Sequence, residues 1–140
     1  MGCPATVAVQ PVAWDDRAAW DLHTLAQDAP GGIAALAREV QEARATAWGI
    51  YEAGERVGTM VTRLDTMADG SRDFVITHAQ ARASVDLTRR VLPVIEVVAW
   101  ALECARVRIH TERRGLSAKL EQQGYSIPEM VLVKGRPDGL

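Results

Sequence analysis

The sequence predicts a mixed α/β or α+β fold in which helices cover a mixed sheet. Three observations favour this class. Valine-rich segments alternate apolar and polar residues as strands do, other segments repeat apolar residues at helical spacing, and a long apolar segment separates the strands expected at 72–80 and 106–112. A helix between two such strands would form a right-handed crossover. A chain of 140 residues suits a single domain, with loose tails expected at 1–4 and 136–140.

The first half of the chain is expected to form a strand, two helices and a hairpin, in that order. Residues 5–13 alternate and are rich in valine, which is typical of a strand. Apolar residues at helical spacing predict helices over 14–30 and 33–47, which a Pro-Gly-Gly run separates. The alternation over 48–65, with a glycine at the turn, predicts a hairpin.

The second half of the chain is expected to alternate strands with helices. A strand over 72–80 precedes a long helix over 84–105, which Pro93 should kink or whose true start it should mark. The remaining elements are a strand, a short helix that ends in a glycine cap, and a last strand, over 106–112, 113–125 and 129–135.

Composition and charge limit the classes of partner. Apolar residues make up 48% of the chain and charged residues 24%, and the net charge of −2 gives no reason to expect nucleic-acid binding. The most apolar run, over 91–101, is too short to span a bilayer, and residues 1–13 lack the pattern of a signal peptide. We therefore expect no membrane partner and a cytoplasmic location.

Neither the cysteines nor the histidines predict a metal centre. Cys3 and Cys104 are far apart, and a disulfide framework or a zinc site needs more cysteines at tighter spacing. Cys104 ends an apolar run and is interpreted as a small buried residue. Of the other candidates, His23 has charged neighbours and is expected to be solvated, and His110 alternates with apolar residues late in a strand.

The order of elements, with the final "RVRIHTERRGLSAKLEQQGYSIPEMVLVKG", resembles the GNAT acetyltransferase superfamily. The hairpin "WGIYEAGERVGTMV" looks like the family's paired strands that open onto the substrate, and residues 73–112 are similar to its acetyl-CoA-binding core. Gly124-Tyr125 resembles the family's helix end before its last strands. The likeness spans most of 5–134 and is similar, more narrowly, to short GNAT-like proteins of tailed phages. It implies a mostly antiparallel sheet flanked by about four helices.

The resemblance makes the turn after the 72–80 strand a degenerate cofactor loop. The family's pyrophosphate loop reads Gln/Arg-x-x-Gly-x-Gly/Ala, and the cofactor-binding positions that match it here are Gln80, Arg82, Ala83, Ser84 and Val85. Gln80 fits, whereas Ala83 and Val85 add side chains where the backbone should approach a phosphate closely. An anion could still bind through Arg82, Ser84 and the start of the helix.

Few residues are candidates for catalysis. The family's proton-donating tyrosine corresponds to Leu120, which cannot donate a proton. His78 ends a strand beside the cofactor loop and is the best placed histidine to act as an acid or base, the alternative being a satisfied or exposed side chain. Glu96 is the only charge at the apolar centre of the long helix. It could be a base with a raised pKa, although a narrow solvent stripe with Arg89 and Glu103 is favoured.

Aromatic and charged residues indicate contacts with other proteins. Trp14 and Trp20 cannot share one narrow helix face, so an exposed tryptophan is expected as a partner contact, with burial at the core edge as the alternative. Glu52 and Glu55 could orient a substrate amine or lie in a solvated turn. Arginines near the cofactor loop and beyond it could bind phosphate, nucleic acid or an acidic partner, or form an ordinary charged surface. They are Arg82, Arg89, Arg90, Arg106, Arg108, Arg113 and Arg114. Arg113 and Arg114 are predicted partner contacts.

Two functions from different classes follow. The main expectation is a non-catalytic GNAT-fold protein without a cofactor, which acts as a structural or interaction component of a phage particle or its assembly. It would contact other chains of that assembly in the cytoplasm or in a virion assembled there. The alternative is an acetyl-CoA-dependent N-acetyltransferase acting on an amine, with His78 or a water-linked carboxylate as base.

Overall fold

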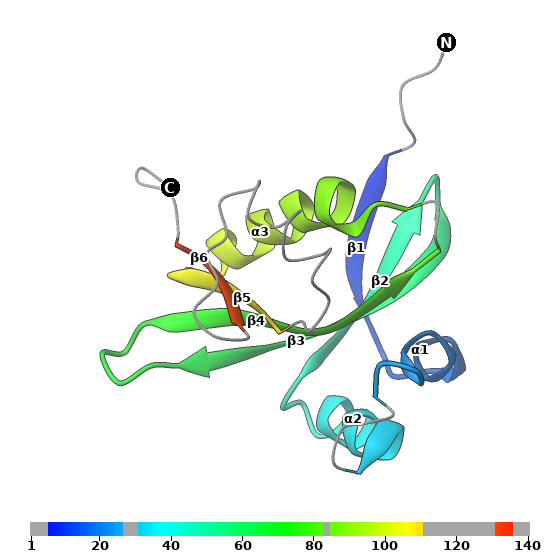
Figure 1. Ribbon diagram of the computed structural model, residues 1–140, viewed down its shortest axis with the longest axis horizontal. Helices are drawn as coiled ribbons and strands as arrows, with labels where there is room; N and C mark the ends of the chain where they lie inside the picture. Colours follow the sequence, from blue (N-terminus) through cyan, green and yellow to red (C-terminus); the bar gives the residue numbers. More distant parts are fainter. Residues whose placement is uncertain (1–5, 27–30, 83–84, 111–130, 136–140) are drawn as a thin grey trace.

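The computed structural model describes residues 6–26, 31–82, 85–110 and 131–135, which contain a six-stranded sheet (Figure 1). Its strands are β1 (Val7–Val12), β2 (Thr46–Glu52), β3 (Glu55–Thr66), β4 (Arg72–Ala81), β5 (Arg106–His110) and β6 (Val131–Gly135). They lie side by side in chain order, and only β4 and β5 are parallel among the neighbouring pairs. The predicted mixed, mostly antiparallel sheet is therefore confirmed.

Helices cover both faces of the sheet (Figure 1). The described ones are α1 (Asp16–Leu22), α2 (Gly32–Gln41) and α3 (Leu92–Ala101), the last continuing a π-helical turn, η1 (Leu87–Val91). One core cluster joins the sheet to α3 and includes Met60, Phe74 and Ile95. A second joins the opposite face to α1 and α2 and includes Leu22 and Val61. The two clusters define an α3 face and an α1/α2 face of the sheet.

The first two helices are shorter than the sequence predicts. Helix α1 begins after Asp15, whose side chain accepts a hydrogen bond from the Ala18 amide at 2.8 Å, and it ends at Leu22 instead of continuing toward residue 30. Helix α2 ends at Gln41 because Ala43 takes a positive φ of 61°. Residues 46 and 47, predicted as helix, are the start of β2.

The long helix also has different ends. It begins at Leu87 rather than at residue 84, since Asp86 caps it, and it stops at Ala101, ahead of Glu103 with φ 61°. Pro93 lies in the first turn of α3, so of its two predicted roles it marks the start of the α-helical part. The predicted helix over 113–125 and the predicted loose tails lie outside the described residues, so about four helices stays a prediction.

The β2–β3 hairpin confirms the sequence prediction. Glu52 and Glu55 form its last cross-strand pair, and the two residues between them, Ala53 and Gly54, have φ values of 51° and 82°. Two consecutive positive φ values are the geometry of a type I′ turn, which matches the twist of the strands. Trp48 and Ile50 point into the core, as the alternation predicts.

Candidate functional site

Strands β4 and β5 pair over only part of their length. The parallel ladder runs from Asp73↔Arg106 to Ile76↔Ile109, whereas β4 continues to Ala81 along β3. No other described residue pairs with β4 on that side beyond Ile76. Beyond Ile76, β4 thus runs on without a described partner on the β5 side, and it leads directly into the predicted cofactor loop.

A β-bulge between β3 and β4 lies next to the end of the β4–β5 ladder. The register between β3 and β4 shifts from Thr62↔Ile76 to Val61↔His78, so Thr77 is the extra residue. Bulges redirect the side chains that follow them. Val61 packs on the α1/α2 face, and cross-strand partners share a face, so His78 lies on the α1/α2 face as well.

Two hydrogen bonds fix the tautomer of His78. The Thr77 hydroxyl donates to the carbonyl oxygen of Val61 at 3.2 Å, so its only proton is used. Nδ1 of His78 lies 2.9 Å from the same Thr77 Oγ1, so with the Thr77 proton directed at Val61, Nδ1 is the donor of this pair. In the neutral ring this assignment leaves the lone pair of His78 on Nε2, which is the form that can accept a proton.

The described part of the cofactor loop departs from what its sequence suggests. Gln80 is the cross-strand partner of Thr59, and the Arg82 amide donates to the carbonyl oxygen of Val57 at 3.0 Å. Val85 is 6% exposed and belongs to the core beneath α3, so its side chain points inward rather than outward from the turn. Ala83 and Ser84 lie outside the described residues.

The chain supplies its own anion at the start of the long helix. Oδ1 of Asp86 accepts from the amides of Thr88 and Arg89, both at 3.2 Å, and from the Thr88 hydroxyl at 2.8 Å. These amides would otherwise be donors for a bound anion. A phosphate group at this turn would therefore depend on side chains more than on the helix amides.

Two arginines supply such side chains, and both form ion pairs with the hairpin. Arg82 pairs with Glu55, and Arg90 pairs with Glu52. The hydrogen bond and charge of Arg82 hold the pKa of Glu55 below its ordinary value, and Glu55 raises the pKa of Arg82 in return. Glu52 and Glu55 were predicted either to orient a substrate amine or to lie in a solvated turn. In the structure both are bound to arginines.

Glu96 does not lie on the predicted solvent stripe. It is 8% exposed, whereas Arg89 and Glu103 are exposed at the surface, so the stripe interpretation is wrong. An apolar face of α3 therefore contains a buried carboxyl group, which the helical period alone does not reveal. Its role as a base stays a prediction.

A polar network links α1 to β3 on the face that carries His78. Thr59 is fully buried, donates to Oδ2 of Asp21 at 2.8 Å and accepts from Arg56 at 2.9 Å. Arg17 binds both carboxylate oxygens of Asp21 at 3.0 Å, and Arg56 reaches Asp15 at 2.6 Å. This network was not predicted from the sequence, although Arg17 and Asp21 have the i, i+4 spacing of a helical ion pair.

Further arginines lie on the sheet in ion pairs. Arg106 binds the fully buried Asp73 through two hydrogen bonds of 3.0 and 2.8 Å. Arg108 reaches Asp65 at 2.5 Å and Asp73 at 3.6 Å. Since Asp73 lies inside the sheet, this group is a structural cross-link between β3, β4 and β5. Arg113 and Arg114, predicted as partner contacts, lie outside the described residues.

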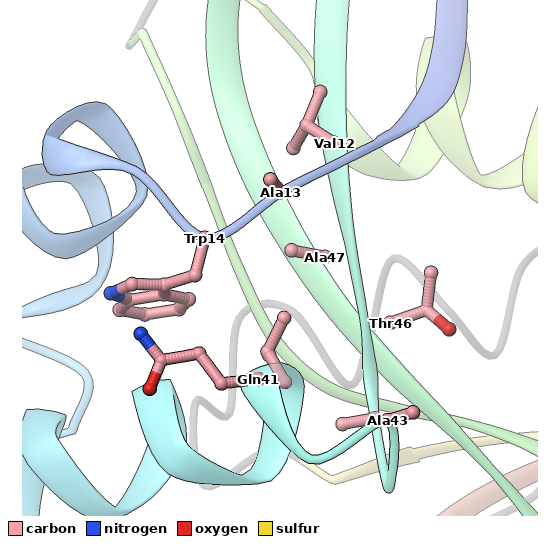
Figure 2. A pocket seen from close by; sticks show the side chains of 9 residues that line it. Val12, Ala13, Trp14, Gln41, Ala43, Thr46 and Ala47 are labelled. Carbon is pink, nitrogen blue, oxygen red and sulfur yellow. The ribbon is translucent and has the colours of Figure 1, made fainter.

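The two tryptophans of the first predicted helix differ in exposure. Trp20 is 72% exposed and stacks near His23, with ring centroids 5.2 Å apart. Trp14 is half-buried and lines an open hollow of about 430 Å³ between β1, α2 and β2, where its ring faces Gln41 (Figure 2). None of the residues around this hollow carries an acid or a base. One exposed tryptophan is thus confirmed, and its partner stays a prediction.

Other candidates are settled within the described parts of the chain. Cys104 is buried with a free thiol, as predicted. No group of three or more described His, Cys, Asp or Glu residues is arranged to hold a metal ion. Among the described residues, no helix has the length and apolar character needed to cross a membrane.

Comparison with solved structures identifies the fold. A GNAT family acetyltransferase from Elizabethkingia anophelis with acetyl-CoA bound is similar, with a TM-score of 0.67 and 12% identity, covering 94% of this chain and 99% of that one. A chain of the NatC complex bound to Gag peptide and CoA has a TM-score of 0.66 and 12% identity, again covering 94% of this chain and 99% of that one. The ribosomal-protein-alanine N-acetyltransferase of Brucella melitensis has a TM-score of 0.64 and 14% identity, covering 89% of this chain and 94% of that one. The chain has the GNAT fold, as its sequence suggests.

No protein-family model matches the sequence, and no curated protein matches it either. The structural comparisons nevertheless correct the main functional expectation. The similar structures are acetyltransferases, and two of those named hold CoA or acetyl-CoA. They contradict the expectation of a non-catalytic structural component without a cofactor and support the acetyl-CoA-dependent alternative. The narrower resemblance to phage proteins stays a prediction.

Proposed function

We propose that the protein is an N-acetyltransferase that uses acetyl-CoA and acts on an amine. The observation that carries the proposal is that β4 continues past its last described β5 partner and through a bulge, with His78 beside that bulge on the α1/α2 face. This arrangement puts a proton acceptor on the part of β4 that lies beyond the described β4–β5 ladder. The fold class of the similar acetyltransferases supports the same conclusion.

The residues around the turn fit a coenzyme with a diphosphate. Arg82 and Arg90 are the cations that would hold the phosphates, because a guanidinium group matches two phosphate oxygens at once. The Val85 side chain lies in the core, so it does not itself obstruct a phosphate at this turn. Acetyl-CoA, when bound, supplies a thioester carbonyl that an amine attacks, so that a C–N bond forms, the C–S bond breaks and the coenzyme leaves as a thiol.

His78 would take the proton that the amine must lose. Only an unprotonated amine is a nucleophile, and the proton has to reach a base within hydrogen-bond reach. Thr77 holds Nδ1 of His78 as the donor, which keeps Nε2 as the acceptor. Such a base contributes typically about 10²- to 10⁴-fold to the rate.

The coenzyme and the amine are tested separately. CoA present at one hundred times its dissociation constant should stabilise the fold by roughly 2.7 kcal/mol, which a thermal melt detects. Incubation with acetyl-CoA and a panel of amines, including peptide N-termini, lysine side chains and small polyamines, should produce an acetylated product by mass spectrometry. An unchanged melt with CoA, together with no acetylated product from any amine, would disprove the proposal.

A further inference from the structure

The hairpin β2–β3 places two carboxylates beside the arginines of the turn after β4. The inference below rests on the proposed function, because it concerns how tightly that turn binds a diphosphate. Glu52 and Arg90 form the more protected ion pair, with side chains 28% and 27% exposed. Glu55 and Arg82 form the outer pair, with side chains 63% and 50% exposed. Each arginine of the turn is therefore already paired with a carboxylate of the hairpin.

The two carboxylates lie side by side at the end of the hairpin. Glu52 and Glu55 are direct cross-strand partners, so their side chains leave the same face of the hairpin. Like charges in directly opposed positions destabilise a strand pair. Arg90 pairs with Glu52 and Arg82 pairs with Glu55, so the two arginines offset this repulsion and stabilise the hairpin.

The hairpin cannot easily move these carboxylates away from the turn. The amide of Arg82 donates to the carbonyl oxygen of Val57, in the strand that follows the hairpin turn. One residue further along, Gly58 lies so close to β4 that an added Cβ would stand 2.8 Å from Cα of Ala81. The carboxylates therefore stay beside the turn whether or not a ligand is bound.

We propose that Glu52 and Glu55 compete with the diphosphate of the coenzyme for Arg90 and Arg82, and so determine coenzyme affinity. When the diphosphate binds, each arginine exchanges a carboxylate partner for a phosphate partner. The released carboxylates remain near the anion and repel it. Asp86 adds a further carboxylate at the same turn, bound to the amides of Thr88 and Arg89. Wild-type affinity is thus lower than the arginines alone would give.

The test measures binding by titration calorimetry in the full chain. CoA is compared with pantetheine, which lacks the diphosphate, for wild type, E52Q, E55Q and the double variant. The expected result is a CoA dissociation constant about tenfold lower in the double variant, with pantetheine binding unchanged. E42Q is the matched control, because Glu42 is an exposed glutamate in an ion pair with Arg44 at 2.7 Å, at the end of α2. It removes one negative charge, as each single variant does, without tightening CoA binding.

Each outcome separates this inference from the proposed function. If wild type binds CoA and the double variant binds it equally or more weakly, the competition is disproved while the proposed function stands. If pantetheine or the E42Q control gains as much affinity as the double variant gains for CoA, the effect is not competition for the arginines and the inference also fails. If wild type binds no CoA at all, the proposed function fails, and this inference fails as well because it depends on that function. The single variant E55Q, which changes the more exposed pair, keeps the test available if the double variant does not fold.

Discussion

Nδ1 of His78 lies 2.9 Å from Oγ1 of Thr77, the residue before it in the chain. Adjacent residues of a regular strand point to opposite faces, so their side chains do not normally meet. The bulge at Thr77 removes this restriction and lets the threonine hydroxyl orient the imidazole. The bulge between β3 and β4 thus brings the Thr77 hydroxyl within hydrogen-bond distance of the candidate base.

Replacing His78 with glutamine should lower the acetylation rate without unfolding the protein. We expect H78Q to reduce kcat by about 10²- to 10⁴-fold, the usual contribution of a positioned base. His78 is only half-buried, so the thermal melt should stay close to that of wild type. Full activity in H78Q would exclude His78 as the base.

Thr77 should act through His78 rather than on the substrate. T77V keeps the shape of the side chain but removes the oxygen that receives the Nδ1 proton, so we expect kcat to fall about tenfold with little change in CoA affinity. T77S keeps the hydroxyl and should restore most of the rate. Equal losses in T77V and T77S would mean that packing, not the hydrogen bond, is responsible.

Asp86 should stabilise the long helix by capping it. D86A removes the acceptor for the amides of Thr88 and Arg89, and we expect a loss of about 1 kcal/mol in the free energy of unfolding by urea. D86N is the control, because asparagine caps a helix about as well as aspartate. If D86N is destabilised as much as D86A, the charge of Asp86 matters more than its capping geometry.

The Cys104 thiol should react slowly while the protein is folded. Burial raises the pKa of this thiol, an effect that the charge of Arg72 partly opposes, so the reactive thiolate is scarce at neutral pH. A C3S variant leaves Cys104 as the single cysteine. We expect a disulfide reagent to modify it slowly in buffer and quickly in guanidinium chloride. Rapid modification under native conditions would contradict the buried position.

The periodicity of the sequence predicted the strands better than the helices. The hairpin was placed correctly because alternation and a glycine turn act within a few residues, as Trp48, Ile50 and Gly54 show. Helix ends were misplaced because they depend on single residues that apolar spacing ignores. Ala43 and Glu103 follow helix ends with a positive φ, a conformation that neither alanine nor glutamate predicts.

The candidate site was only partly predictable. Gln80 and Arg82 were predicted from their match to the family's loop pattern, and His78 from its place at the strand end beside that loop. The inward direction of Val85 could not be read from the sequence, since it depends on where the turn lets the chain enter the core. The ion pairs of Arg90 with Glu52 and of Arg82 with Glu55 join residues far apart in the chain, and only the packing of the hairpin on β4 brings them together.

Gly58 should be required for that packing. A Cβ built at this position would meet the carbonyl oxygen of Gln80 and would stand 2.7 Å from Cβ of Ala81, so backbone atoms of β3 or β4 would have to move. We expect G58A to lower the free energy of unfolding by about 1–3 kcal/mol, the usual cost of overpacking. Chemical denaturation measures this change directly.

The matched control for G58A is G135A, on β6. A Cβ at Gly135 would have no heavy atom of the described residues within 4 Å, and its φ lies outside the positive range, so alanine there should be neutral or slightly stabilising. Because Gly58 follows the Val57 carbonyl that accepts from Arg82, G58A should also displace the hairpin from the turn and change CoA affinity, whereas G135A should not. A G58A protein as stable as G135A would show that β3 and β4 do not approach each other as closely as described.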